Sequence, residues 1–160
     1  MPLTSAEDLN HLRAAEGYTE LGMTKLGVDS LQLRVGIEIH LPEVLAARVE
    51  IYTGLKKWDH LQTVAARLAT HDPNEAQWSI SLAYATRRAQ SIEAAKAILL
   101  EAVERHPNEP MLHYNLACYE CQLGDVEVAK ARLAHAFKLE PKCRLMALDD
   151  DDLEPLWAAL

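Results

Sequence analysis

Apolar residues recur along most of the chain at the spacing of one face of an α-helix, and the apolar runs stop at regular intervals. Pro73, Pro107 and Pro141 each follow such a run, and their positions repeat with one constant period of 34. Proline lacks the backbone N–H donor and clashes with the preceding turn, so it cannot continue a helix. Three helix stops at one period predict three ends of a repeated helical unit.

Small residues keep the same period of 34. A small side chain lets two antiparallel helices approach closely, and a larger one fills the space between layers. The pairs one period apart are Ala83 and Ala117, Ala95 and Ala129, Ala102 and Ala136, and the larger Leu99 and Leu133. The pattern predicts an all-α fold built from paired antiparallel helices.

This pattern resembles the tetratricopeptide repeat (TPR) family, whose unit is a helix–turn–helix with the same period. The best copy, 110–143, carries His113-Tyr114-Asn115-Leu116-Ala117, then Leu123-Gly124-Asp125, then Ala129, Leu133, Ala136 and Pro141. The other copies are 76–109, 42–75 and a degenerate one at about 8–41. The resemblance implies a TPR-type α-solenoid of antiparallel helix pairs. We expect one domain over 1–160, because domains commonly run to about 100–150 residues.

The C-terminal tail has its own pattern. Its Asp152-Leu153-Glu154-Pro155-Leu156-Trp157 run resembles the closing segment of a group of bacterial TPR proteins. Solenoids need a cap on their last repeat. We expect 144–160 to be that cap, with Leu153, Leu156 and Trp157 on a short helix and Asp151 or Asp152 as its N-cap. The alternative is an acidic recognition tail.

The segment 31–41 breaks the helical pattern by strict alternation of apolar and polar residues, which is strand periodicity. One interpretation is a short helix that runs into an extended connector. The other is an exposed strand that pairs with another chain.

The net charge and the number of cysteines limit which classes of partner and which cellular compartment we expect. Sixteen Lys and Arg against 24 Asp and Glu give a net charge of −8, which disfavours nucleic acid. No apolar run approaches the ~18 residues of a membrane span, and the first residues do not form a signal peptide. Three cysteines are an odd number. These features predict a cytoplasmic protein without membrane insertion.

The sequence offers no catalytic constellation, since phosphate-binding loops and nucleophile elbows are missing. Cys118 and Cys121 share one face of a predicted helix, but a zinc site would also need His113, His135 or Cys143. We interpret the cysteines as groove-lining side chains and the histidines as surface residues. The prediction is a non-enzyme without cofactor or metal.

The TPR resemblance implies that the first helix of each repeat lines a concave groove where ligands usually lie. Projecting that face onto the sequence gives an acidic, a basic and an aromatic sector. The acidic sector contains Leu9, Leu12, Glu16, Glu20, Glu43 and Glu50, the basic one Gln77, Ile80, Ser81, Tyr84, Arg87 and Arg88, and the third Met111, Tyr114, Asn115, Cys118, Cys121 and Gln122. We expect a peptide with basic residues toward the first sector and a carboxylate toward Arg87 or Arg88. A solvated helix face is the alternative.

Some TPR proteins hold acidic chaperone tails with a lysine and asparagine clamp. The corresponding residues here are Ala46, Glu50, Ser81, Met111 and Asn115, and only Asn115 matches, so this function is not implied. Two functions remain. One is an adaptor that binds a protein or peptide of unknown identity in the groove. The other is a structural protein that self-associates through 31–41 or the solenoid ends. We expect a monomer or a weak homodimer.

Overall fold

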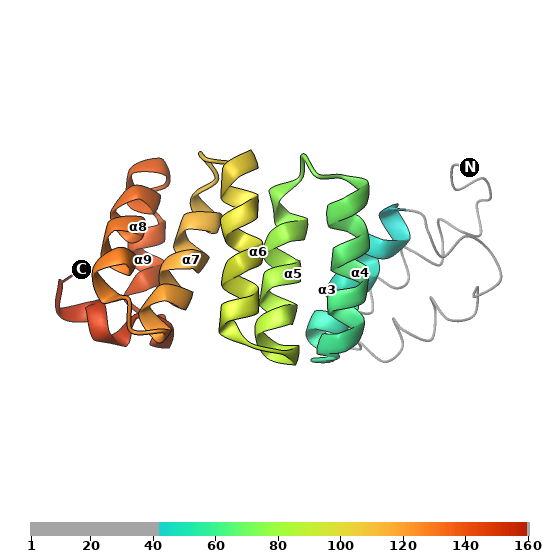
Figure 1. The fold of residues 1–160 in the computed structure, drawn as a ribbon, viewed down its shortest axis with the longest axis horizontal. Coiled ribbons are helices and arrows are strands. Elements are labelled where there is room, and N and C mark those ends of the chain that lie inside the picture. The colour runs from blue at the N-terminus through green and yellow to red at the C-terminus, as the bar shows by residue number, and fades with distance from the viewer. Residues whose placement is uncertain (1–41, 160) are drawn as a thin grey trace. The chain divides into compact units, whose positions relative to one another are not determined.

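The structure of the chain is a computed structural model that describes residues 42–159, with the side chains of Glu43 and Ala159 excepted (Figure 1). The chain divides into two compact units, 1–73 and 74–160, which we describe separately. Helix pairs of a solenoid contact only their neighbours, so compactness alone does not distinguish a domain boundary from a boundary between repeats. The single domain over 1–160 therefore stays a prediction.

In the first unit, the described part is one antiparallel helix pair, α3 (Pro42–Gly54) and α4 (Trp58–His71). Its core is apolar, with Ile51, Leu61 and Leu68 fully buried. The degenerate repeat at 8–41, the 31–41 segment and the acidic residues Glu16 and Glu20 lie outside the described residues.

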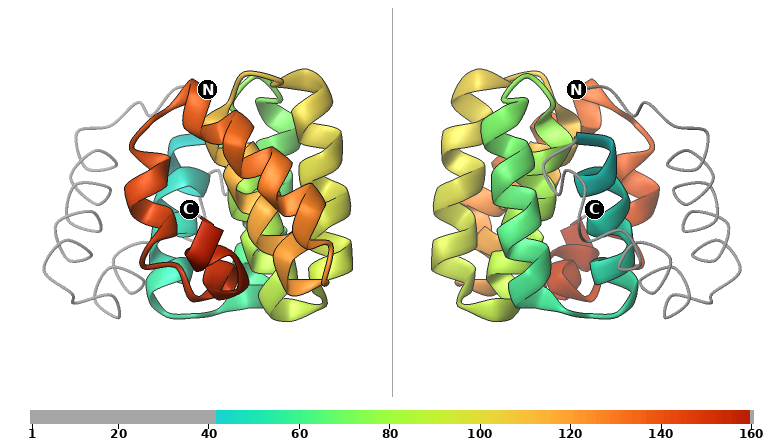
Figure 2. Two further views of the ribbon diagram at one scale, coloured as in Figure 1. Left: turned by 90° about the vertical axis from the view of Figure 1, so that its left-hand side faces the viewer. Right: turned by 90° about the vertical axis from the view of Figure 1, so that its right-hand side faces the viewer.

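The second unit contains two antiparallel helix pairs followed by residues 143–159, which we call the closing segment (Figures 1 and 2). Helix α7 packs against α6, α8 and the closing segment, and so lies at the centre of this unit. The elements are α5 (Ala76–Ala89), α6 (Ile92–Arg105), α7 (Pro110–Gln122), α8 (Val126–Leu139), α9 (Cys143–Ala147) and the 3₁₀-helix η1 (Asp151–Ala159).

Helix ends follow the repeat seen in the sequence. The first helices of the three pairs begin at Pro42, Ala76 and Pro110, which keeps the period of the prolines, and each second helix ends two residues before a proline. Side chains of Glu75 and Glu109 accept hydrogen bonds from the backbone N–H groups of Gln77 and Met111 at 3.1 and 3.2 Å. These contacts satisfy N–H groups that a helix start leaves without an intrahelical partner.

The small residues of the repeat pattern form the contacts between helices. All six paired alanines are fully buried, and so are Leu99 and Leu133. The described residues are helical with no strand. The predicted all-α TPR-type fold of antiparallel helix pairs is therefore confirmed.

The closing segment caps the second unit, in a form that differs in detail from the expectation. Leu153 and Leu156 are buried in the core, whereas Trp157 is 38% exposed and donates its indole N–H to the carbonyl of Ala147 at 3.0 Å. The predicted N-cap at Asp151 or Asp152 is wrong. Asp150 holds that role, because its carboxylate accepts from the backbone N–H of Asp152 at 3.1 Å. No helix of the described residues has the length and apolarity to cross a bilayer.

Candidate functional site

Asp150, just before η1, and Asp152, in its first turn, lie against the side of the second unit formed by α5 and α7, which we call the α5–α7 face. Helix η1 packs against α7, and its Asp152 reaches Arg87 of α5. Asp150 and Asp152 there contact four side chains of the face. These are Arg87 from α5 and Tyr114, Cys118 and Gln122 from α7.

Arg87 binds Asp152 through both ends of its guanidinium. Nη2 donates to Oδ1 at 2.7 Å, and Nη1 donates to Oδ2. The same guanidinium lies 5.3 Å from the ring centroid of Tyr119, a cation–π distance. The hydrogen bond to Asp152 is the main cause that raises the pKa of Arg87 above its ordinary value. Arg87 is thus a planar donor aimed at a carboxylate.

Asp150 is held by two neutral donors on α7. The hydroxyl of Tyr114 donates to Oδ2 at 2.9 Å, and the thiol of Cys118 contacts the same oxygen at 3.5 Å. Burial is the first cause that raises the pKa values of both groups, followed by the interactions with Asp150. Burial also raises the pKa of Tyr119 to about 12. These groups keep their protons at neutral pH and remain donors.

The backbone of the segment is held as well. The side-chain amide of Gln122 donates to the carbonyl of Asp152 at 3.0 Å. Immediately after this contact, Leu153 and Leu156 enter the core cluster that also contains Leu112 and Leu116. The α5–α7 face therefore holds two carboxylates two residues apart, one backbone carbonyl and two leucines.

Several other predicted groove residues of the second unit make contacts within their own helices or with the core. Ile80 and Met111 are partly buried against the core. The amide N–H of Asn115 donates within its own helix to the carbonyl of Met111 at 2.7 Å. Arg88 is exposed, with its guanidinium 5.3 Å from the centroid of the half-buried Tyr84.

In the first unit, Glu50 is an exposed residue of α3, and the backbone of Glu43 lies in the same helix. The acidic sector therefore remains a prediction.

Cys118, Asp150 and Asp152 each place one possible metal ligand within 4.8 Å of the other two. A cation there would have to displace Arg87 from Asp152 and remove a proton from Cys118, whose pKa burial raises. Both changes oppose metal binding. The arrangement fits carboxylate recognition better than metal coordination.

Sequence reasoning missed a buried ion-pair network around Glu120. Its carboxylate accepts from Nε of Arg132 at 2.9 Å on both oxygens, and Nζ of Lys96 lies 3.7 Å away. The network joins α7 to α8 and α6. A charged residue within the apolar stripe that includes Leu116 and Cys121 was the signal available in the sequence.

The histidines were all interpreted as surface residues, and for His113 this is wrong. His113 is buried, and its Nε2–H donates to the carbonyl of Pro107 at 2.7 Å. Its ring lies edge-on to that of His135, with centroids 4.4 Å apart. These contacts give both histidines a packing role between α7 and α8.

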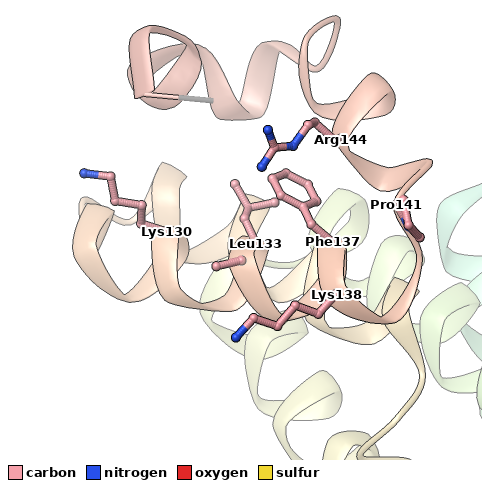
Figure 3. Close-up of a pocket in the computed structure, with 7 residues that line it drawn as sticks. Lys130, Leu133, Phe137, Lys138, Pro141 and Arg144 are labelled. Carbon is pink, nitrogen blue, oxygen red and sulfur yellow. The ribbon is translucent and has the colours of Figure 1, made fainter.

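A second surface feature lies between α8 and the start of α9. A cavity of about 420 Å³ has an apolar floor formed by Leu133, Ala134 and Phe137. Figure 3 shows three cationic side chains around it, Lys130, Lys138 and Arg144. The guanidinium of Arg144 lies 5.2 Å from the ring centroid of Phe137.

The C-terminal part of the second unit also exposes large apolar side chains. Leu145 is 70% exposed, and Met146, Leu148 and Trp157 are also exposed. Exposed apolar side chains that gather in one patch commonly mark an interface.

Comparisons with known proteins give structural neighbours only. The chain matches no family model and no curated protein. Thirteen chains of solved structures match, among them two of MamA. The MamA structure designated MSR-1 C2 has a TM-score of 0.72 and 19% identity, covering 86% of this chain and 79% of its own. The RS-1 ArsTM double mutant of MamA has a TM-score of 0.74 and 15% identity, with coverages of 86% and 78%. At these identities the likeness shows the fold, which is that of a TPR protein.

Proposed function

We propose that the chain is a protein-interaction adaptor whose α5–α7 face docks a segment of a partner protein. The observation that carries the proposal is the occupied state of this face. Arg87, Tyr114, Cys118 and Gln122 already hold a short acidic segment through side-chain and backbone contacts. A face that binds one short segment in this way has the donors needed to bind another.

The proposal carries no chemical step, since the side chains of this face serve as donors to carboxylates. We place the adaptor in the cytoplasm of a bacterium. The three cysteines are free and buried, which suits a reducing compartment. The resemblance of 152–157 to the closing segments of bacterial TPR proteins supports the source.

Photocrosslinking in the native host tests the docking site. We would place benzoylphenylalanine at Tyr84, one turn before Arg87 on α5, and in a control chain at Val128, an exposed residue of α8. We expect a discrete protein adduct from the Tyr84 position that is missing from the Val128 position. The purified partner should then bind Tyr84→Ala at least tenfold more weakly, because aromatic contacts dominate such interfaces. Equal adducts from both positions would refute the site.

A second candidate function is self-association through the C-terminal end. The exposed Leu145, Met146, Leu148 and Trp157 favour it, together with the basic cavity at Phe137. A second copy is the expected occupant, because a chain of net charge −8 offers carboxylates to Lys130, Lys138 and Arg144.

Light scattering during gel filtration tests the second candidate. If the wild-type chain is dimeric, Leu145→Glu with Leu148→Glu should give a monomer. Leu100→Glu, at an exposed leucine of α6, should leave the dimer intact. A wild-type chain that stays monomeric at high concentration would reject self-association.

A further inference from the structure

We infer that the partner segment imitates residues 149–159 of the chain itself, which we call the resident segment, and that it binds by displacing them. Like the resident segment, it carries two carboxylates two residues apart followed by two leucine-like residues. This inference rests on the proposed docking role of the α5–α7 face and names its ligand class and its regulation.

The charge requirement follows from the donors of the face. Arg87 donates to both oxygens of Asp152, while Tyr114 and Cys118 both donate to the same oxygen of Asp150. A planar guanidinium matches a carboxylate in two-pronged geometry. Amide side chains in place of the two carboxylates would present N–H groups to these donors or lose half of the contacts. The face therefore selects acidic residues at the Asp150 and Asp152 positions.

The apolar requirement follows from burial. Leu153 and Leu156 are fully buried within the core cluster of the second unit. Removing them without replacement would expose apolar surface and leave a void, which a partly exposed ion pair does not offset. An incoming segment that supplies only carboxylates cannot displace the resident one. The spacing of Asp150, Asp152, Leu153 and Leu156 is the expected motif.

The resident segment has the advantage of covalent attachment. Only Leu148, Asp149 and Asp150 connect α9 to η1, so the segment competes at an effective concentration on the order of millimolar. The apparent affinity of an outside segment is therefore its intrinsic affinity multiplied by the fraction of chains whose face is open. A change that weakens the contacts of the resident segment with the face must therefore tighten the binding of the outside segment.

The test uses the full chain and a fluorescein-labelled peptide with the sequence of residues 149–159, measured by fluorescence anisotropy. Four proteins form a cycle. They are the wild type, Asp150→Ala with Asp152→Ala on the resident segment, Arg87→Ala on the face, and all three changes together. The resident-side variant keeps Leu153 and Leu156, and circular dichroism with a thermal melt checks that each protein is folded.

We expect weak binding to the wild type and about tenfold tighter binding to the resident-side variant. Arg87→Ala alone should change the apparent affinity little, because it weakens the resident and the incoming segment alike. The triple variant should bind about three- to fivefold more weakly than the resident-side variant, the range of a partly exposed ion pair. A control peptide with Asn at the Asp150 and Asp152 positions should lose this sensitivity to Arg87. If Arg87→Ala does not fold, Gln122→Ala, which removes a donor to the segment's backbone, takes its place in the cycle.

Equal affinity for the wild type and the resident-side variant, or no binding to either, would overturn the inference and make the segment a permanent cap. Crosslinking from Tyr84 to a partner without peptide binding would leave the adaptor role standing and reject only this ligand class. Peptide binding in the expected order, without a crosslinked partner, would reject the adaptor role and keep the displacement.

Discussion

Arg87 and Asp152 lie 65 residues apart in the sequence and form a two-pronged ion pair that joins the first helix of the second unit to its closing segment. Their side chains are 17% and 25% exposed, so solvent screens the pair only in part. Arg87 also packs against the ring of Tyr119. Together with the contacts of Tyr114, Cys118 and Gln122, this ion pair links the cap of the fold to the proposed docking face.

The stability contributed by this pair is measurable in a double-mutant cycle. Arg87→Ala and Asp152→Ala should each lower the free energy of unfolding by about 1 kcal/mol, and the double variant by little more than either. Urea unfolding followed by circular dichroism gives the three values. Additive losses would mean that the two residues act independently.

The buried network at Glu120 should matter more for stability than any exposed pair. Glu120→Ala leaves the mostly buried guanidinium of Arg132 without its carboxylate, and we expect a loss of about 3 kcal/mol. Glu127→Ala is the matched control, because the side chain of Glu127 is exposed and pairs with Lys130 at 3.7 Å. It should change stability by less than about 0.5 kcal/mol. Similar losses for both variants in urea unfolding would contradict the network.

Gly124 and Lys56 occupy equivalent turns two repeat lengths apart, and both have positive φ, 89° and 55°. Side chains beyond glycine disfavour this conformation by about 1–2 kcal/mol. We expect Gly124→Ala to lower the melting temperature although the added carbon meets no atom within 4 Å. Lys56→Gly should raise it by removing the same strain. Opposite signs in a calorimetric scan would confirm the turn geometry, and the same sign would reject it.

Alkaline pH should lower the free energy of unfolding of the second unit, because three of its buried groups have raised pKa values. Burial raises the pKa of Cys118 above its ordinary 9.0, and raises the pKa values of Tyr114 and Tyr119 above 10.0. At a pH between the ordinary and the raised pKa of each group, the unfolded chain loses a proton that the folded chain keeps. Stability is therefore full below pH 9 and falls as pH rises. Urea unfolding at pH 7, 9 and 10.5 measures the slope. Cys118→Ala should flatten its first part, and an unchanged slope would exclude the thiol as a cause.

The sequence by itself determined the repeat. Pro73, Pro107 and Pro141 stop helices for local steric reasons, and alanines that recur at the same period mark where neighbouring helices cross. Both signals depend on residue size and backbone chemistry, which need no knowledge of distant contacts. For this reason the helix pairs and the buried alanines could be predicted.

Only the tertiary structure decided what the predicted groove holds. Arg87, Tyr114, Cys118 and Gln122 were chosen as groove residues from a projected helix face, but their shared contact is the chain's own closing segment. Asp150 and Asp152 reach them because the chain turns back after α9 and packs η1 against α7, a path that no local pattern encodes. The burial of Glu120 likewise depends on cations supplied by α6 and α8. Pairing across helices is set by three-dimensional proximity, and the repeat period carries no information about it.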